Sequence, residues 1–417
     1  MLYIKSLLVT TTALVAWTLV VGYVALNGWG RNPIATPGDS RSFAHAAIEI
    51  IKKENHGNVA FLLIEGGKTF EEFYIGNETP DEDTIFATAS MSKWITAWGV
   101  MKLVQDRKID LDAPVSTYLT RWQLPETEFD NEGVTVRRLL SHMSGLNDGL
   151  GFADYGADEV VPPLTRTLSG PRASSGNPVK IAVGVEPGSE FHYSGGGYLI
   201  LQLLIEEVSG ETFQDYMRQS LFRPLGMTRS TYQYLGEVEN VSKSYDEQGQ
   251  IAPLYQYAAS GATGFATTLA DVGKFIRAQL KINAMPNPLN QESIKSMRQT
   301  HASVYGKDIW GLGTILYAAT ANGDLVYGHD GRNEPAINST VRINPDNGDA
   351  IAVLVSGRKS LATNLGFEWV FWQTGLPGVL GTGRVIREAA KPFFAGCVLI
   401  LFLAVATTWW LRRRVWR

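Results

Sequence analysis

Two uncharged apolar runs lie near opposite ends of this 417-residue chain and restrict how it can fold. Residues 7–26 and residues 392–411 each form a run of 20 residues without a charged side chain. About 20 apolar residues are what a helix needs to cross a bilayer. The two runs therefore predict two membrane helices, with residues of about 30–390 held together on one side of the membrane.

The first run, residues 7–26, can be interpreted as a membrane anchor or as a signal peptide that is removed. Lys5 precedes the run, as in both kinds of segment. The run is long for a signal peptide, and no A-x-A cleavage pattern closes it. The sequence favours the anchor, and the signal peptide stays as the alternative.

The second run ends in Trp409 and Trp410, and residues 412–417 then form a basic tail with four arginines. Interfacial tryptophans followed by arginines are typical of the cytoplasmic end of a membrane helix. We therefore expect both termini in the cytoplasm and the central domain on the periplasmic or extracellular side. Cys397, the one cysteine of the chain, lies inside this run and rules out an intrachain disulfide.

The composition of the chain is that of a globular protein, with 45% apolar and 19% charged residues. The formal net charge is −4, so the basic excess of a nucleic-acid-binding protein is missing and no such partner is expected. The six histidines show no metal-ligand spacing, and no H-E-x-x-H pattern is present.

Between the two runs, the pattern of apolar residues and turns predicts one α+β domain over residues 40–375. Residues 42–54 and 359–373 have the character of helices, and residues of about 90–300 are mainly helical. Apolar runs separated by turn residues predict three hairpins, at residues 59–64 with 69–75, 314–317 with 325–328, and 339–343 with 350–355. Strands from both ends of the domain would then build one antiparallel sheet, with the helical region inserted between them.

The strongest chemical signal is Ser90-x-x-Lys93. At the start of a helix, residues i and i+3 share a face, so the lysine amine can reach the serine hydroxyl. A buried lysine has a lowered pKa and can accept a proton, which activates a serine nucleophile. A second match, Ser356-x-x-Lys359, follows a predicted strand and contains a glycine, so we interpret it as a strand end.

Several further blocks occur in a fixed order after Ser90-x-x-Lys93. They are VTVRRLLSHMSGL at residues 134–146, PGSEFHYSGGGY at 187–198, PLGMT at 224–228, GATGFATTLAD at 261–271 and GHDG at 328–331. Together they resemble the serine β-lactamase and penicillin-binding protein superfamily, in its class C-like branch, which also includes carboxypeptidases and esterases.

The resemblance implies a role for each matching position. Ser90 would be the acylated nucleophile, Lys93 its proton partner and Tyr193 a second acid/base. The backbone N–H groups of Ser90 and Arg332 would form the oxyanion hole. His329 and Gly331 would belong to the third motif, which binds substrate. The implied partner is a small-molecule or peptide substrate, and the implied chemistry needs no metal and no cofactor.

Two positions depart from the family pattern. Gly195 stands where the family has the asparagine of Tyr-x-Asn, and His329 stands where it has the lysine of Lys-Thr-Gly. Both changes weaken contacts with a carboxylate-bearing acyl-amide, so we expect a poor β-lactamase and a better esterase or peptidase. Since an ordinary histidine has a pKa of about 6.5, His329 is expected to titrate near neutrality.

Two other functions stay open at this point: a true class C-like β-lactamase, and a catalytically silent protein that binds cell wall or a partner. His142 is interpreted as a structural residue near the site, and Asp148 and Asp330 are candidate polar site residues. Residues 149–183 would form a lid or a wall of the cleft.

The predicted topology can be tested with reporter fusions. A reporter that works only in the cytoplasm is expected to be active when fused after residue 417, because the arginines of the tail remain inside. A periplasm-only reporter that is active at the same place would contradict the two-helix topology. Release of the central domain by signal peptidase would contradict the N-terminal anchor alone.

Overall fold

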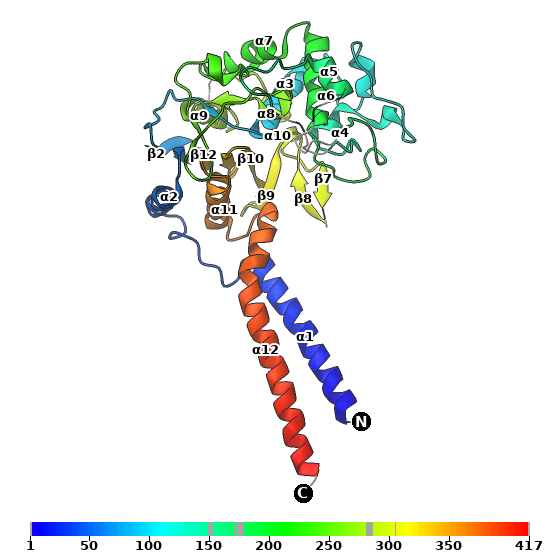
Figure 1. The fold of residues 1–417 in the computed structure, drawn as a ribbon, viewed down its shortest axis with the longest axis vertical. Helices are drawn as coiled ribbons and strands as arrows, with labels where there is room; N and C mark the ends of the chain where they lie inside the picture. Colours follow the sequence, from blue (N-terminus) through cyan, green and yellow to red (C-terminus); the bar gives the residue numbers. More distant parts are fainter. Residues whose placement is uncertain are drawn as a thin grey trace.

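The computed structural model describes residues 2–148, 152, 154–170, 172, 179–280, 287–304 and 306–415. Figure 1 shows a rounded domain from which helices α1 (Leu2–Leu26) and α12 (Thr382–Val415) project side by side from the same face. The predicted α+β class and the terminal apolar helices are confirmed.

One antiparallel sheet organises the domain, with strand order β2-β1-β12-β11-β10-β9-β8-β7. β1 pairs with β12 from Asn58↔Ser356 to Ile64↔Ala350, so the two ends of the domain meet in adjacent strands near one edge of the sheet. All three predicted hairpins are present, and the predicted meeting of the chain ends in one sheet is confirmed. The strands are β1 (Asn58–Glu65), β2 (Lys68–Ile75), β7 (Ala302–Val304), β8 (Lys307–Trp310), β9 (Ile315–Ala319), β10 (Leu325–Asn333), β11 (Ile337–Ile343) and β12 (Ala350–Ser356).

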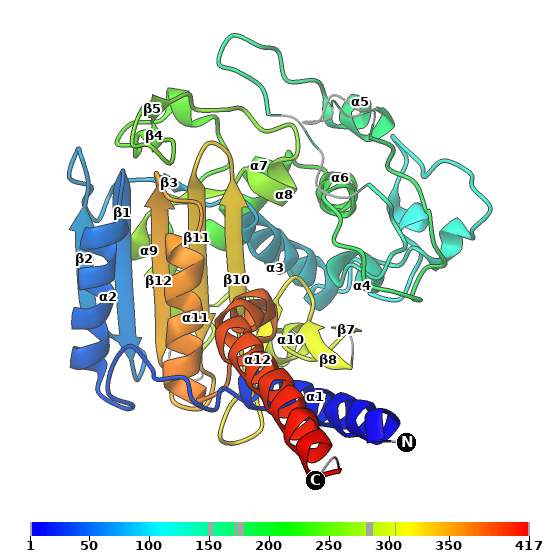
Figure 2. The same cartoon turned by 60° about the horizontal axis from the view of Figure 1, so that its bottom comes forward.

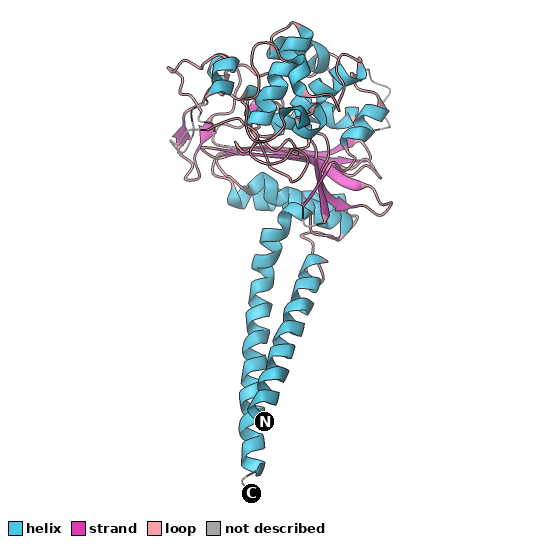
Figure 3. Cartoon of the chain, turned by 90° about the vertical axis from the view of Figure 1, so that its right-hand side faces the viewer, coloured by secondary structure: helices cyan, strands magenta, loops and turns pink. Residues whose placement is uncertain are grey.

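Helices cover both faces of the sheet. α2 (Ser40–Glu54) and α11 (Leu361–Thr374) lie on the face nearer to α1 and α12, and the helical region lies on the other face (Figures 2 and 3). β11 and β12 are buried along their whole length, as expected for strands covered on both faces. The helical region and its short strands comprise β3 (Phe86–Ala87), α3 (Met91–Gln105), α4 (Val136–Leu140), α5 (Leu164–Ser169), α6 (Gly196–Ser209), α7 (Phe213–Met217), β4 (Ser244–Tyr245), β5 (Ile251–Ala252), α8 (Ser260–Thr263), β6 (Ala266–Thr267), α9 (Leu269–Ala278) and α10 (Gln291–Met297).

The two projecting helices pack against each other along their length. The Trp17 indole donates to the carbonyl of Phe393 at 3.0 Å, and the Ser6 and Thr408 hydroxyls lie 2.8 Å apart. Within them, Tyr3–Leu26 and Val385–Arg413 are long and apolar enough to cross a membrane. α12 begins ten residues before the predicted run and contains Pro392, which a helix tolerates with the loss of one backbone hydrogen bond.

An ion pair joins the base of the projecting helices to the domain. The Arg31 guanidinium lies 2.9 Å from a Glu368 carboxylate oxygen on α11 and 3.9 Å from one of Glu388 on α12. It also stacks over the Phe371 ring, 4.8 Å from its centroid. These contacts hold the α11 face of the domain toward the two helices.

Candidate active site

Ser90 lies immediately before helix α3, at the junction between the sheet and the helical region. Ala89 adopts a left-handed φ of 51°, which turns the chain sharply into the helix. α3 is buried on nearly all sides, so the residues of its first turn are fixed by packing. One turn along, the Lys93 amine lies 3.3 Å from the Ser90 hydroxyl oxygen, the arrangement that the i, i+3 spacing predicts.

The Lys93 side chain has no exposed surface, and its amine has two hydrogen-bond acceptors. Besides Ser90, it donates to the carbonyl of Ala262 on α8 at 3.0 Å. Burial lowers the pKa of Lys93 to about 7, and the charge of Asp148 opposes this shift. The neutral amine, which can accept a proton, is therefore well populated at neutral pH.

The ring of Tyr193 lies against the same amine, 4.9 Å from centroid to nitrogen. Burial raises the pKa of Tyr193 above its usual value, while a hydrogen bond with Ser90 opposes this shift. The phenol is therefore protonated at neutral pH and can donate a proton rather than accept one. The structure thus places Ser90, Lys93 and Tyr193 together, although they come from segments about 100 residues apart.

His142 supports Tyr193 from behind. Its Nδ1 accepts the backbone N–H of Ser194 at 3.1 Å, and its ring lies 4.3 Å from the Tyr193 ring. Burial lowers the pKa of His142 well below its usual value, and the charge of Lys93 acts in the same direction. A neutral imidazole that accepts at Nδ1 is protonated at Nε2, so His142 acts as a hydrogen-bonding support.

Asp148 fixes the chain after Tyr193 by accepting hydrogen bonds at the N-terminus of α6. It accepts the Ser194 hydroxyl at 2.5 Å and the Gly196 N–H at 2.8 Å. A carboxylate is favourable at a helix N-terminus, where free N–H groups gather. Asp148 is therefore a positioning residue, and Gly195 lies directly between its two partners.

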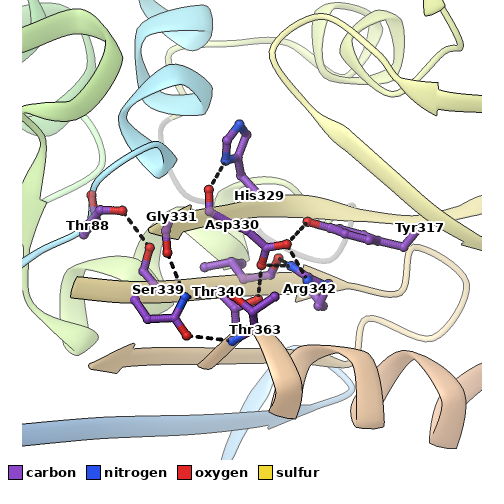
Figure 4. Close-up of polar contacts among 11 residues, drawn as sticks. Thr88, Tyr317, His329, Asp330, Gly331, Ser339, Thr340, Arg342 and Thr363 are labelled. Carbon is purple, nitrogen blue, oxygen red and sulfur yellow. Dashed lines mark hydrogen bonds and ion pairs between the residues drawn. The ribbon is translucent and has the colours of Figure 1, made fainter. Parts of the chain in front are cut away.

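Strand β10 presents alternate residues to opposite faces of the sheet, and this separates His329 from Asp330. Figure 4 shows the His329 ring on one side of the strand and the Asp330 carboxylate on the other, toward Tyr317 and Arg342. Asp330 accepts from Thr340 at 2.7 Å and pairs with the fully buried Arg342 at 2.8 Å. The prediction of Asp330 as a site residue is wrong, because its side chain faces α11.

His329 faces the site but is only 1% exposed. Its Nδ1 lies 2.6 Å from the carbonyl oxygen of Asp330, and its ring meets Trp310 edge-on at 5.5 Å. Burial lowers the pKa of His329 to about 3, against the effect of the Asp330 carbonyl. The expectation that His329 titrates near neutrality is therefore wrong, and the imidazole is neutral in the folded protein.

Gly331 allows β10 to approach the segment before the nucleophile. A Cβ atom at this position would lie 1.9 Å from the carbonyl oxygen of Thr88, two residues before Ser90. The Ser339 hydroxyl donates to the same carbonyl at 2.7 Å and ties the two segments together (Figure 4). The Ser90 N–H has no acceptor among the described residues, which leaves it available for an oxyanion.

One side of β10 is open beside the site. β9 pairs with β10 only from Leu325 to Gly328, and no other described strand pairs with His329–Asn333 on that side. This edge includes Arg332, whose N–H is the second predicted oxyanion donor. An extended substrate can therefore lie along the edge next to Ser90.

The second S-x-x-K match, Ser356-x-x-Lys359, does not form a comparable site. Ser356 is the last residue of β12, and its hydroxyl donates to the Lys243 carbonyl at 2.9 Å. Lys359 instead pairs with Glu334 at 2.7 Å. Its interpretation as a strand end agrees with this placement.

Some residues of the site carried no recognisable sequence signal. Ala262 and Thr88 act through backbone carbonyls, which any residue could supply. Trp310 is buried and contacts the rings of His142, Tyr193 and His329. Residues 149–183, predicted as a lid or wall, lie partly outside the described residues. No group of three or more potential metal ligands occurs in the described part of the chain.

Comparison with known proteins identifies the family. The family model named Beta-lactamase matches residues 43–366. The chain therefore belongs to the β-lactamase family of serine hydrolases, which the resemblance of its motifs had indicated.

Curated relatives are distant. Penicillin-binding protein 4 of Amycolatopsis lactamdurans is 26% identical over 298 residues, covering 66% of this chain and 73% of the relative. Protein flp of Staphylococcus aureus (strain N315) is 24% identical over 279 residues, covering 63% of this chain and 53% of the relative. The chain thus spans about half the length of the flp proteins that it matches.

Solved structures share the fold. The octameric penicillin-binding protein homologue from Pyrococcus abyssi matches with a TM-score of 0.65 and 24% identity, over 81% of this chain and 78% of the other. The D-amino acid amidase from Ochrobactrum anthropi SV3 matches with a TM-score of 0.61 and 23% identity, over 84% and 98%. At these identities the likeness extends to the fold alone.

Replacing the buried amine is expected to stabilise the protein. The unfolded chain holds the Lys93 proton up to about pH 10.5, while the folded chain releases it near pH 7. Unfolding therefore takes up a proton between these values, so the free energy of unfolding rises with pH. Lys93→Met lacks this rise and should be about 2–4 kcal/mol more stable than the wild type at pH 7. Chemical denaturation at pH 7 and 9.5 measures the gap, which should narrow at the higher pH. Equal free energies of unfolding for the wild type and Lys93→Met at pH 7, or a difference that grows with pH, would contradict burial of a neutral amine.

A side chain at position 331 is expected to abolish activity. In Gly331→Ala, the new methyl group overlaps the Thr88 carbonyl and must displace β10 or the segment leading to Ser90. Turnover of an activated ester should fall by more than about 100-fold, because displacements of about 1 Å already cost this much. Gly378→Ala is the control, since its Cβ would have only ordinary contacts of 3.7 Å. Full activity in Gly331→Ala would show that the approach to Thr88 is dispensable.

Proposed function

We propose that the chain is a membrane-anchored serine hydrolase that forms an acyl-enzyme on Ser90 with an ester, a peptide or a peptidoglycan-type amide outside the cytoplasm. The observation that carries the proposal is the fully buried Lys93 amine, 3.3 Å from the Ser90 hydroxyl and against the Tyr193 ring. A lysine whose pKa is lowered to about 7 by burial beside a serine is suited to activate it.

In the acylation step, the neutral Lys93 amine takes the proton of the Ser90 hydroxyl as the oxygen attacks the substrate carbonyl. The N–H groups of Ser90 and Arg332 stabilise the developing oxyanion. The protonated Tyr193 phenol donates its proton to the leaving group, and the Lys93 ammonium returns a proton to Tyr193. The products of the step are an ester on Ser90 and a protonated leaving group.

In the second step, a water molecule attacks the Ser90 ester. The neutral Lys93 amine accepts a proton from this water, directly or through Tyr193, and returns it to the Ser90 oxygen as the ester breaks. The acid product leaves, and the free hydroxyl is restored.

His329 and Gly195 favour substrates without a carboxylate at the third motif. With a pKa of about 3, the imidazole is neutral and cannot form an ion pair with a carboxylate. Gly195 offers no side-chain amide to the substrate. An ester or a neutral amide needs neither contact, whereas a β-lactam would lose both.

The anchoring part of the proposal is supported by α1 and α12, whose apolar side chains are largely exposed. Leu7, Leu19 and Phe402 are each about two-thirds exposed to the surroundings, which a bilayer would cover. Since α2 and α11 lie on the sheet face nearer to these helices (Figure 2), the opposite face, which the helical region covers, would be directed away from the membrane (Figure 3).

The pH dependence of ester hydrolysis tests the role of Lys93. For an uncharged ester, kcat/KM should rise with pH up to about 7, where Lys93 loses its proton, and then reach a plateau. No further limb from His329 is expected above pH 5, because its pKa lies far below that value. The measurement is a pH profile with p-nitrophenyl acetate, corrected for the uncatalysed rate. A rate that falls as pH rises from 6 to 8 would contradict the assignment of Lys93 as base.

Covalent labelling tests Ser90 itself. A fluorescent fluorophosphonate should label the wild type and the control variant Ser356→Ala, but not Ser90→Ala. Ser90→Ala and Lys93→Ala should each lower kcat by several orders of magnitude, and the double variant should be little worse, because the two residues act as one unit.

The wild type and the same variants also distinguish the alternative functions. Labelling that persists in Ser90→Ala would contradict the assignment of Ser90 as the nucleophile. Absence of any label or turnover in the wild type favours a catalytically silent binding protein. If kcat/KM for nitrocefin far exceeds that for p-nitrophenyl acetate, the chain is a β-lactamase, and the argument from Gly195 and His329 is wrong.

A further inference from the structure

A carboxylate that pairs with no basic side chain of the described residues lies beside the open edge of β10. Asp154 is partly buried, and burial raises the pKa of its carboxyl group to about 6, with the nearby Glu334 charge acting in the same direction. Its carboxylate accepts a hydrogen bond from the Asn333 side chain at 3.1 Å. No lysine or arginine nitrogen of the described residues lies within 4.0 Å of the carboxylate oxygens.

A neighbouring guanidinium, that of Arg172, pairs with another carboxylate. Arg172 donates to the backbone carbonyl of Asp154 at 3.2 Å, while its ion pair is with Glu159 at 2.5 Å. A partly buried carboxylate without a cation is unfavourable, and the neighbouring Glu334 makes it more so. The hydrogen bond from Asn333 offsets this only in part, and no basic side chain of the described residues pairs with the carboxylate, so a cation supplied from outside the chain would be stabilised there.

The position of Asn333 places Asp154 along the path of the substrate. His329, Gly331 and Asn333 alternate along β10 and therefore share the face that meets α3. Asn333 is two residues beyond Gly331, about 7 Å along the strand, and it follows Arg332 of the predicted oxyanion hole. Asn333 also forms a hydrogen bond with Tyr257, which lies just before α8. The Ala262 carbonyl of α8 accepts the hydrogen bond from the Lys93 amine.

We propose that Asp154 and Asn333 form a subsite that binds a protonated amine on the acyl part of the substrate, so that the enzyme favours aminoacyl esters and amides with a free amino group over their N-acylated forms. This proposal rests on the function proposed above. Asp154 would supply the charge, Asn333 would hold the carboxylate in place, and the open edge of β10 would align the backbone of the substrate.

The test compares three kinds of substrate that share the Ser90 chemistry. Alanine thiobenzyl ester, in the D and the L form, carries a free amine, and N-acetylalanine thiobenzyl ester carries none. p-Nitrophenyl acetate reports hydrolysis without any acyl-side recognition. For the full chain in detergent, at least one enantiomer of the free-amine ester should have a kcat/KM about tenfold or more above that of its N-acetyl form.

Two variants test whether the preference for a free amine depends on Asp154. Asp154→Asn keeps the size and an oxygen acceptor but removes the charge, so the ratio of free-amine to N-acetyl kcat/KM should fall to about one. Asp158→Asn removes an exposed carboxylate from the same segment and should leave the ratio unchanged. Because the ratio is measured within each variant, a general loss of active protein does not alter it.

The outcomes distinguish the subsite from the general function. If Ser90-dependent hydrolysis of p-nitrophenyl acetate is present but the N-acetyl ester is equal or better, or neither alanine ester is turned over, the amine subsite is overturned and the hydrolase stands. A preference that survives in Asp154→Asn overturns the role of Asp154. If no Ser90-dependent hydrolysis of any substrate occurs, the proposed function itself fails.

Discussion

The burial of one lysine amine determines how the site is built. Lys93 has no contact with solvent, and a permanently charged amine in such a place would be strongly destabilising. Its pKa of about 7 shows how the fold resolves this, because the amine is held neutral for much of the time and still has the Ala262 carbonyl as an acceptor. The tight packing of α3, the rings of Tyr193 and Tyr198 and the approach of α8 all keep water away from this nitrogen. The chemistry proposed for Ser90 follows from that exclusion.

The two faces of strand β10 have different roles. His329, Gly331 and Asn333 face the helical region, whereas Asp330 forms a buried ion pair with Arg342 beneath α11. The strand that borders the substrate is thus held in place from the opposite side by charge and hydrogen bonds. A single chain segment can therefore serve binding and stability at once, since its side chains alternate.

The parts of the structure that depend on local pattern were predictable from sequence, and those that depend on burial were not. The hairpins, the helix after Ser90 and the sheet built from both ends of the domain follow from periodicity and turn residues. The sequence also favoured Ser90 over Ser356, because only the first lies in a helical context. By contrast, the side of β10 that Asp330 faces, the shift of the His329 pKa and the Ala262 carbonyl all depend on neighbours distant in sequence. Asp154 gave no signal, because an acidic residue in a loop is ordinary until the structure shows that no described basic side chain pairs with its carboxylate.

The pairing of β1 with β12 also has a consequence for biogenesis. β1 is the first long strand to leave the ribosome, and β12 is the last, so one edge of the apolar β1 strand stays without its partner while most of the domain is being made. Such an edge readily pairs with other chains, and closing so long a loop slows folding. Translocation across a membrane would present the strand in this same unprotected state. Shielding of the nascent β1–β2 hairpin until β12 has been made should therefore favour correct folding over pairing with other chains.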